Sequence, residues 1–157
     1  QGKTERTTIS VSAKTIDKSD YFPLVLGAFN PNLSGGKEGT FSVDTKTFKP
    51  SQWGIGGWHF PSGLDLSSYK YLIVDLKSVP GGDMNFNIRD ENNIWAGAAE
   101  YKPNGSKRIV VDLNNMKRVN SDISVNSSQI YYVGFWNYGP DTPVSIDNIY
   151  LMNELPN

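Results

Sequence analysis

Apolar and polar residues alternate with a period of two along much of this chain, and residues 84–89 (MNFNIR) show it most clearly. Because successive side chains of a β-strand point to opposite faces, Met84, Phe86 and Ile88 are predicted to pack inward. The polar residues of the same segment are predicted to line the outer face of a sheet: Asn85, Asn87 and Arg89. Asparagine is disfavoured in strands, so two copies on one face point to a function.

Short segments of this kind recur along the chain, separated by turn residues. The predicted strands span residues 7–12, 21–26, 39–44, 53–60, 69–77, 84–90, 94–101, 107–113, 130–138 and 144–152. Asn104-Gly105 is the strongest turn signal, because both residues tolerate a positive φ and suit a tight hairpin. The longest connection, residues 114–129, has room for one short helical turn near residues 114–116. Short strands at this spacing predict an all-β fold, a two-sheet antiparallel β-sandwich of the jelly-roll type.

Length and composition narrow the class of protein. A chain of 157 residues predicts one domain spanning residues 1–157. The net charge of −1 argues against nucleic acid or an anionic membrane surface as partner. No apolar run approaches the roughly 18 residues of a transmembrane helix, so membrane insertion is not expected. The absence of cysteine excludes disulfides and cysteine-based metal sites. The abundance of Asn, Ser, Thr, Gly and Tyr favours an exported protein, extracellular or on the cell surface.

The four tryptophans stand beside glycines, asparagines or turn residues rather than inside apolar runs. In residues 130–138, alternation separates Val133 and Phe135 from Trp136 and Tyr138. If the first set is core, Trp136 and Tyr138 lie on the outer face. Trp95 is expected to be exposed, whereas the remaining two suit the core and a ligand platform equally: Trp53 and Trp58.

A sheet face that carries amides, a guanidinium and aromatic rings suits carbohydrate. Amides pair with sugar hydroxyls as donors and acceptors, a guanidinium donates, and rings cover the apolar C–H face of the sugar. Aromatic residues and Arg also supply much of the affinity at protein interfaces. The candidate ligand-binding residues are Trp58, Asn85, Asn87, Arg89, Trp95, Trp136 and Tyr138.

The sequence gives weaker indications of a catalytic site than of a binding site. A glycoside hydrolase needs two carboxylates across one sugar site, and no such pair stands out, so no catalytic residue is predicted. Two alternatives remain open. The first is a small sandwich-fold glycan-active enzyme, with Glu100 facing the same groove as Arg89 and either Asp90 or Glu91 as the second acid. The second is a structural or adhesive spacer domain whose tryptophans are all buried.

Three phrases of the sequence resemble a known superfamily. They are residues 63–74 (GLDLSSYKYLIV), 130–136 (IYYVGFW) and 144–151 (VSIDNIYL). Together they resemble the jelly-roll carbohydrate-binding modules attached to polysaccharide-degrading enzymes, and in particular modules of Bacteroidetes-type glycan-utilisation proteins. The resemblance spans roughly residues 53–151.

The resemblance implies a non-catalytic module, tethered to a catalytic domain, that binds a glycan chain in a groove on one sheet or at loops on the sandwich edge. We expect a β-linked plant polysaccharide of the β-glucan, xylan or mannan class as partner. Members of the superfamily often hold a structural calcium, and Asp147 matches the acidic position in their last strand. The second acidic ligand would come from the N-terminal part of the chain.

Overall fold

The computed structural model describes residues 27–35, 39–81, 83–138 and 142–155, and within these ranges every regular element is a β-strand. The strands are β1 (Thr40–Ser42), β2 (Thr47–Lys49), β3 (Ile55–Leu64), β4 (Tyr71–Leu76), β5 (Met84–Arg89), β6 (Ala99–Tyr101), β7 (Arg108–Asp112), β8 (Ile130–Asn137) and β9 (Val144–Met152). They form a five-stranded sheet in the order β1-β2-β9-β4-β7 and a four-stranded sheet in the order β3-β8-β5-β6. All strand pairs are antiparallel.

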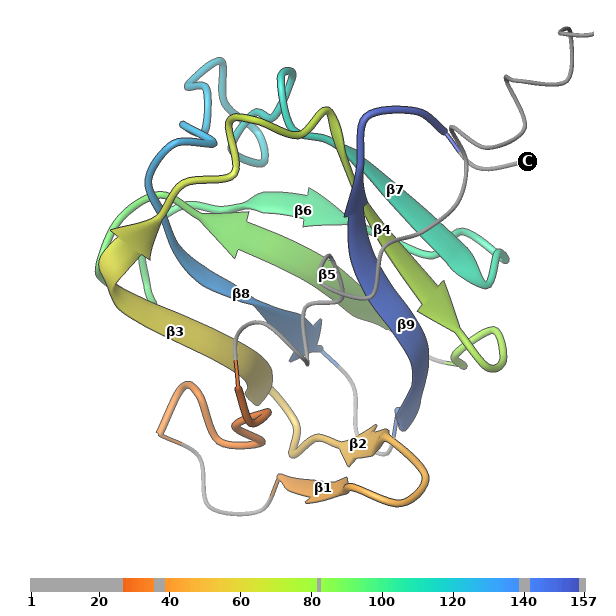
Figure 1. Cartoon of the computed structure of the whole chain (residues 1–157). Helices are drawn as coiled ribbons and strands as arrows, with labels where there is room; N and C mark the ends of the chain where they lie inside the picture. Colours follow the sequence, from red (N-terminus) through yellow and green to blue (C-terminus); the bar gives the residue numbers. More distant parts are fainter. Residues whose placement is uncertain (1–26, 36–38, 82, 139–141, 156–157) are drawn as a thin grey trace, which may run out of the picture.

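The two sheets face each other across one hydrophobic core, as Figure 1 shows. Phe86 of β5 and Phe135 of β8 meet there edge to face, with ring centroids 5.1 Å apart. Val74 of β4 and Ile149 of β9 reach the same core from the opposite sheet. The predicted all-β fold with two antiparallel sheets is therefore confirmed, and its architecture is sandwich-like.

The predicted strand faces agree with the register. Phe86 lies opposite Phe135 and Ile88 opposite Val133, so the apolar sets of β5 and β8 share the inner face. The polar set of β5 consequently points to the outside of the four-stranded sheet. The other strands predicted within the described residues agree with the structure to within a few residues at most ends.

Three local expectations differ from the structure. Residues 94–98 form a turn-rich loop, because the Asn93 side chain accepts a hydrogen bond from the Trp95 backbone N–H and favours a turn there. Asn104 and Gly105 adopt positive φ angles of 52° and 78°, as predicted, but their turn connects β6 to β7, which lie in different sheets. Residues 114–116 contain a turn and bend rather than a helical turn.

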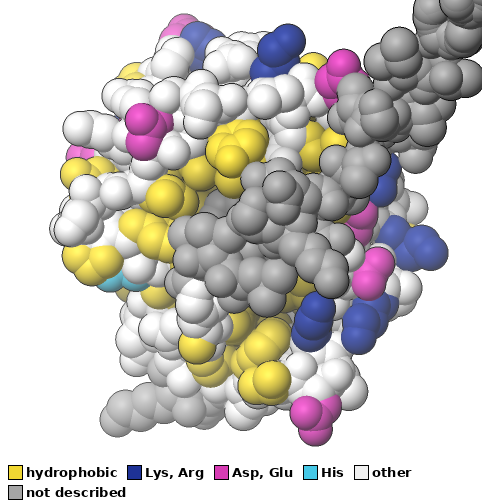
Figure 2. Space-filling view, viewed as in Figure 1, with side chains coloured by type: hydrophobic (Ala, Val, Ile, Leu, Met, Phe, Trp, Pro, Cys, Tyr) yellow, Lys and Arg dark blue, Asp and Glu magenta, His cyan; other side chains and the backbone are white. Residues whose placement is uncertain are grey.

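The side of the molecule seen in Figures 1 and 2 is the edge of the sandwich at which β3 and β9 lie toward the viewer. Hydrophobic side chains form several patches on this side, and a group of Lys and Arg side chains lies toward its right border (Figure 2). The predicted strands 7–12 and 21–26 fall outside the described residues. In the described ranges, no helix offers a stretch long and apolar enough to cross a membrane.

Candidate functional site

The outward side of the four-stranded sheet, here called the outer face, gathers most of the candidate residues. Directly opposed residues of neighbouring strands share a face, so the register defines three rows across the sheet. The rows are Ile55–Trp136–Asn85, Gly57–Gly134–Asn87–Glu100 and His59–Tyr132–Arg89. From Asn85 to Arg89 the face extends four residues along the strand, about 13 Å at about 3.3 Å per residue.

A line of hydrogen bonds, here called the polar chain, runs over this face from a cation to an anion. Arg89 Nη1 donates to Asn87 Oδ1, and Asn87 Nδ2 donates to Asn85 Oδ1 at 2.9 Å. Asn85 Nδ2 donates to the Tyr138 hydroxyl at 3.0 Å, and that hydroxyl donates to Glu100 Oε1 at 3.1 Å. A guanidinium only donates, so the Asn87 side-chain oxygen must point toward Arg89. This orientation fixes the direction of each following hydrogen bond, from Asn87 to Asn85, to Tyr138 and to Glu100.

The polar members of this chain are more deeply buried than expected. Asn85 and Asn87 are 0% exposed and Arg89 is 3% exposed. Their amide groups bond to one another, and Arg89 Nε donates to the Ala96 carbonyl at 3.0 Å. Burial lowers the pKa of Arg89, against the opposing field of Glu100. Direct contact with sugar hydroxyls would need these three side chains in the open, and the structure instead buries them in bonds to one another and to the Ala96 carbonyl.

Three aromatic rings, here called the aromatic trio, lie at one end of the outer face: Trp53, Trp136 and Tyr138. The Tyr138 ring is 4.8 Å from Trp136 and 6.0 Å, edge to face, from Trp53. Trp136 Nε1 donates to the Trp53 carbonyl at 3.2 Å. Trp53 is 57% exposed, while Trp136 and Tyr138 are partly exposed. The trio thus presents indole and phenol surface to solvent, as predicted for Trp136 and Tyr138.

Trp53 owes its position to an uncommon backbone conformation. Its φ is +64°, a region that large residues rarely occupy. Its backbone N–H donates to the Asn137 carbonyl at 2.8 Å, which anchors the residue next to the end of β8. The sequence left this residue equally suited to core and ligand; the structure places it in the open.

The opposite end of the outer face carries a second aromatic group. His59 stacks on Tyr132 with ring centroids 4.2 Å apart and planes at 7°. His59 Nε2 and Asn92 Oδ1 are 2.7 Å apart, which ties β3 to the loop of residues 90–98. Trp95 extends from this loop and is 66% exposed, as predicted. The loop also supplies the Ala96 carbonyl that holds Arg89.

Arg118 braces that loop from the connection of residues 114–129. Its Nη2 bonds to Glu91 and, at 3.3 Å, to Asp90. A Cβ on Gly97 would lie 2.9 Å from Arg118 Cδ, so only glycine lets the arginine stem pass this closely. The hydrogen bond that Arg118 donates to Glu91, chief among several contacts, raises the pKa of Arg118.

These contacts separate the acids of the enzyme hypothesis. Asp90 is held by Arg118 and by the Asn126 backbone N–H at 2.8 Å, and Glu91 by Arg118. Glu100 shares the outer face with Arg89, as predicted, but bonds to Tyr138 at the far end of the polar chain. The candidate acids thus belong to two networks rather than to one paired site.

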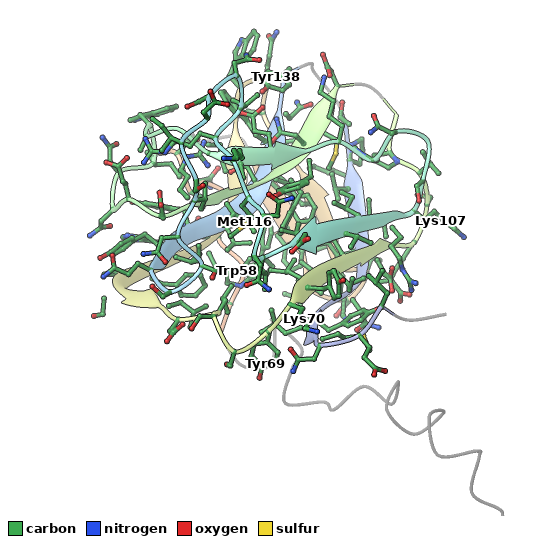
Figure 3. All side chains as sticks on the ribbon, turned by 90° about the horizontal axis from the view of Figure 1, so that it is seen from above. Trp58, Tyr69, Lys70, Lys107, Met116 and Tyr138 are labelled. Carbon is green, nitrogen blue, oxygen red and sulfur yellow. The ribbon has the colours of Figure 1, made fainter. Side chains whose placement is uncertain are left out.

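Trp58 lies away from the outer face. It is 3% exposed and belongs to the core, where its ring meets Phe29 edge to face at 5.1 Å. Figure 3 shows it between the two sheets, like Met116 and unlike the peripheral Tyr138. The expectation that Trp58 extends the aromatic platform is corrected, because its register partner Val133 faces inward.

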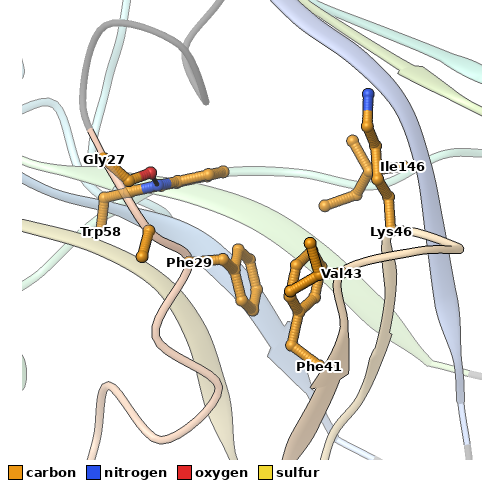
Figure 4. A pocket seen from close by; sticks show the side chains of 8 residues that line it. Gly27, Phe29, Phe41, Val43, Lys46, Trp58 and Ile146 are labelled. Atoms are coloured by element: carbon orange, nitrogen blue, oxygen red, sulfur yellow. Dashed lines mark hydrogen bonds between the residues drawn. The ribbon is translucent and has the colours of Figure 1, made fainter.

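Trp58 also lines an apolar cavity of about 360 Å³ between β3 and β9 (Figure 4). Its Nε1 donates to the Gly27 carbonyl at 3.3 Å on one side of this space. Phe29 and Phe41 stack at 4.5 Å on the floor, and Lys46 and Ile146 lie across from Trp58.

Asp147, the candidate calcium ligand, is exposed on β9. It lines a cleft of about 450 Å³ together with Asp75, Lys107 and Arg108. Both oxygens of Asp75 are already bonded, to Arg108 at 2.6 and 2.9 Å and to Tyr150 at 2.8 Å. Calcium needs several oxygen ligands, and of the two carboxylates that line this cleft Asp75 is held by Arg108 and Tyr150. Across the described ranges, no three acidic, histidine or cysteine side chains gather into a metal-sized group. The second acidic ligand was expected from N-terminal residues, of which 1–26 lie outside the described ranges.

Comparisons with known proteins find no match: no family model fits the chain, and neither a curated protein nor a solved structure matches it. What the chain binds is therefore a question for the geometry of its outer face.

Proposed function

We propose that this chain is a non-catalytic carbohydrate-binding module that recognises a β-linked plant polysaccharide of the β-glucan, xylan or mannan class. One observation carries the proposal: aromatic rings stand open to solvent at both ends of a hydrogen-bonded polar row on a single sheet face. Trp53 and Trp95 are the most exposed of them. Their exposure also argues against a spacer domain whose tryptophans are all buried.

The rings supply the stacking surface in this proposal. An indole covers the apolar face of a sugar ring, and it orders at little cost because it has only two rotatable side-chain bonds. Trp53, Trp136 and Tyr138 receive one end of a glycan chain, and Trp95 receives the other. A span of about 13 Å between the outermost rows suits an extended oligosaccharide rather than a single sugar.

The polar chain supplies orientation. The partly exposed Glu100 accepts hydrogen bonds from sugar hydroxyls. The Tyr138 hydroxyl is held between Asn85 and Glu100, so its oxygen has a fixed position. The buried polar residues do not contact the ligand in this proposal but hold the residues that do. Asn85 holds Tyr138, and Arg89, which bonds to Asn87, holds the loop at Ala96. We further propose that the two sheets form a jelly roll, and that the module works outside the cell, tethered to a polysaccharide-degrading catalytic domain.

A glycan panel tests the proposal. Affinity gel electrophoresis and calorimetry against β-glucans, xylans and mannans are expected to give dissociation constants in the micromolar to millimolar range, or about −4 to −8 kcal/mol. Trp136→Ala and Trp95→Ala should each weaken binding while the fold, followed by circular dichroism, stays intact. Failure to bind any of these glycans would overturn the proposed function.

A further inference from the structure

Among the described residues, a carboxylate pairs with the cation at each end of the outer face. Lys102 pairs with Asp83 at 3.3 Å, next to the Tyr138 ring, and its Nζ lies 5.9 Å from that ring's centroid. At the opposite end Arg118 bonds to two carboxylates, Asp90 and Glu91. Each end of the face is therefore neutral or slightly acidic.

The centre of the face follows the same rule. Arg89 donates to Asn87, which lies directly opposite Glu100 across the β5–β6 pair. The polar chain then joins the guanidinium to the Glu100 carboxylate through two amides and a hydroxyl. Arg89 is buried, whereas Glu100 is partly exposed. An arriving ligand therefore meets the negative end of this chain and not the positive one.

We propose that this face selects uncharged glycans, and that Glu100 is the residue that excludes acidic ones. This inference rests on the proposed function, whose site it shares. A polyuronate brings a carboxylate on every sugar and requires an open cation to compensate for its loss of water. Here the central cation is covered, and the exposed charge repels. A neutral glycan meets no such barrier, and its hydroxyls can donate hydrogen bonds to Glu100.

The substitution Glu100→Gln isolates the charge. Glutamine keeps the shape of the glutamate side chain, and its amide oxygen can still accept the hydrogen bond from the Tyr138 hydroxyl. It leaves Arg89 without its counter-charge, so the centre of the face becomes positive. Glu154→Gln is the matched control, because it removes the same charge from an exposed residue beyond the end of β9, in the other sheet.

The experiment uses two pairs of ligands that share a backbone and differ in their carboxylates. They are manno-oligosaccharides with mannuronate oligosaccharides, and cello-oligosaccharides with their C6-oxidised forms. Calorimetry at low and at high salt is run on the wild type, Glu100→Gln and Glu154→Gln. The wild type is expected to bind at least one neutral ligand. Salt should not change that affinity, because screening acts only between charges and the ligand has none. Glu100→Gln should bind the acidic partner of that ligand about tenfold more tightly than the wild type does, an effect lost at high salt.

Each outcome has a distinct meaning. If the wild type binds acidic ligands as well as neutral ones, selection for uncharged glycans is wrong while carbohydrate binding stands. If it binds neither set nor any other glycan of the panel, the proposed function itself fails. If Glu100→Gln gains no more than Glu154→Gln does, Glu100 is not the excluding residue. A Glu100→Gln protein that fails to fold leaves the wild-type comparison as the test.

Discussion

Replacing Trp53 by alanine is the most direct test of the aromatic trio. The residue is 57% exposed. Fully burying a tryptophan removes about 150–250 Å² of surface, so roughly 90–140 Å² of this indole is open. A sugar ring stacked on one side would cover about half of that, roughly 45–70 Å². At about 25 cal/mol per Å², this contact contributes about 1.1–1.8 kcal/mol. Trp53→Ala should therefore weaken glycan binding by roughly 6- to 20-fold, since about 1.4 kcal/mol is a factor of ten.

The fold should tolerate this change. The hydrogen bonds of Trp53 to Asn137 and Trp136 use its backbone N–H and carbonyl, which alanine retains. At a φ of +64° the Cβ of alanine meets the same carbonyl oxygen as the Cβ of tryptophan, so the substitution adds no backbone strain. Calorimetric titration with the best glycan of the panel measures the affinity, and thermal unfolding checks the fold. Val43→Ala, which shortens an exposed apolar side chain beyond β1, serves as control. An affinity equal to that of the wild type, with Trp136→Ala impaired, would remove Trp53 from the site.

Three further predictions concern the core, the five-stranded sheet and the loop of residues 90–98. Trp58→Ala should lower the free energy of unfolding by about 3–5 kcal/mol in denaturant titrations, as truncation of a core aromatic does; unchanged stability with weaker glycan binding would restore Trp58 to the platform. Burial alone would raise the pKa of Asp75, but bonds from Arg108 and Tyr150 outweigh it and lower the pKa. Its carboxylate therefore stabilises the fold above its unfolded pKa of about 3.9. Asp75→Asn should be less stable at neutral pH by about 1–2 kcal/mol, a deficit that disappears as the pH falls through the folded pKa; a deficit of equal size at every pH would contradict this. Arg118→Ala should speed amide hydrogen exchange in residues 90–98 and weaken glycan binding severalfold, whereas unchanged exchange would show that Arg118 does not hold the loop.

The sequence predicts the faces of the strands better than what covers them. The alternation in residues 84–89 assigns Met84, Phe86 and Ile88 to the core, and all three lie there. The same alternation puts Asn85 and Asn87 on the outer face, but it carries no information on the neighbours that bury them. Solvent exposure depends on partners distant in sequence, such as Tyr138.

Elements held by distant partners are the ones that the sequence missed. β2 has one apolar residue, Phe48, before a proline, and such a segment resembles a turn. Its strand conformation comes from pairing with β1 on one side and with β9, nearly a hundred residues away, on the other. For Trp58, a period of two groups it with Gly56, but not with a particular side of the sheet. Packing against Phe29 decides that Trp58 faces inward.

The line from Arg89 to Glu100 has one further consequence, which concerns entropy. Every donor in it points the same way, so no amide can turn over without placing N–H against N–H. The dipoles of Asn87, Asn85 and Tyr138 are consequently locked before any partner arrives. Side chains that are already ordered lose little conformational entropy when a ligand binds. The smaller entropy cost makes binding tighter. Under the proposed function, an array with a fixed direction would also distinguish the two ends of a sugar chain, so that a glycan would dock with one polarity only.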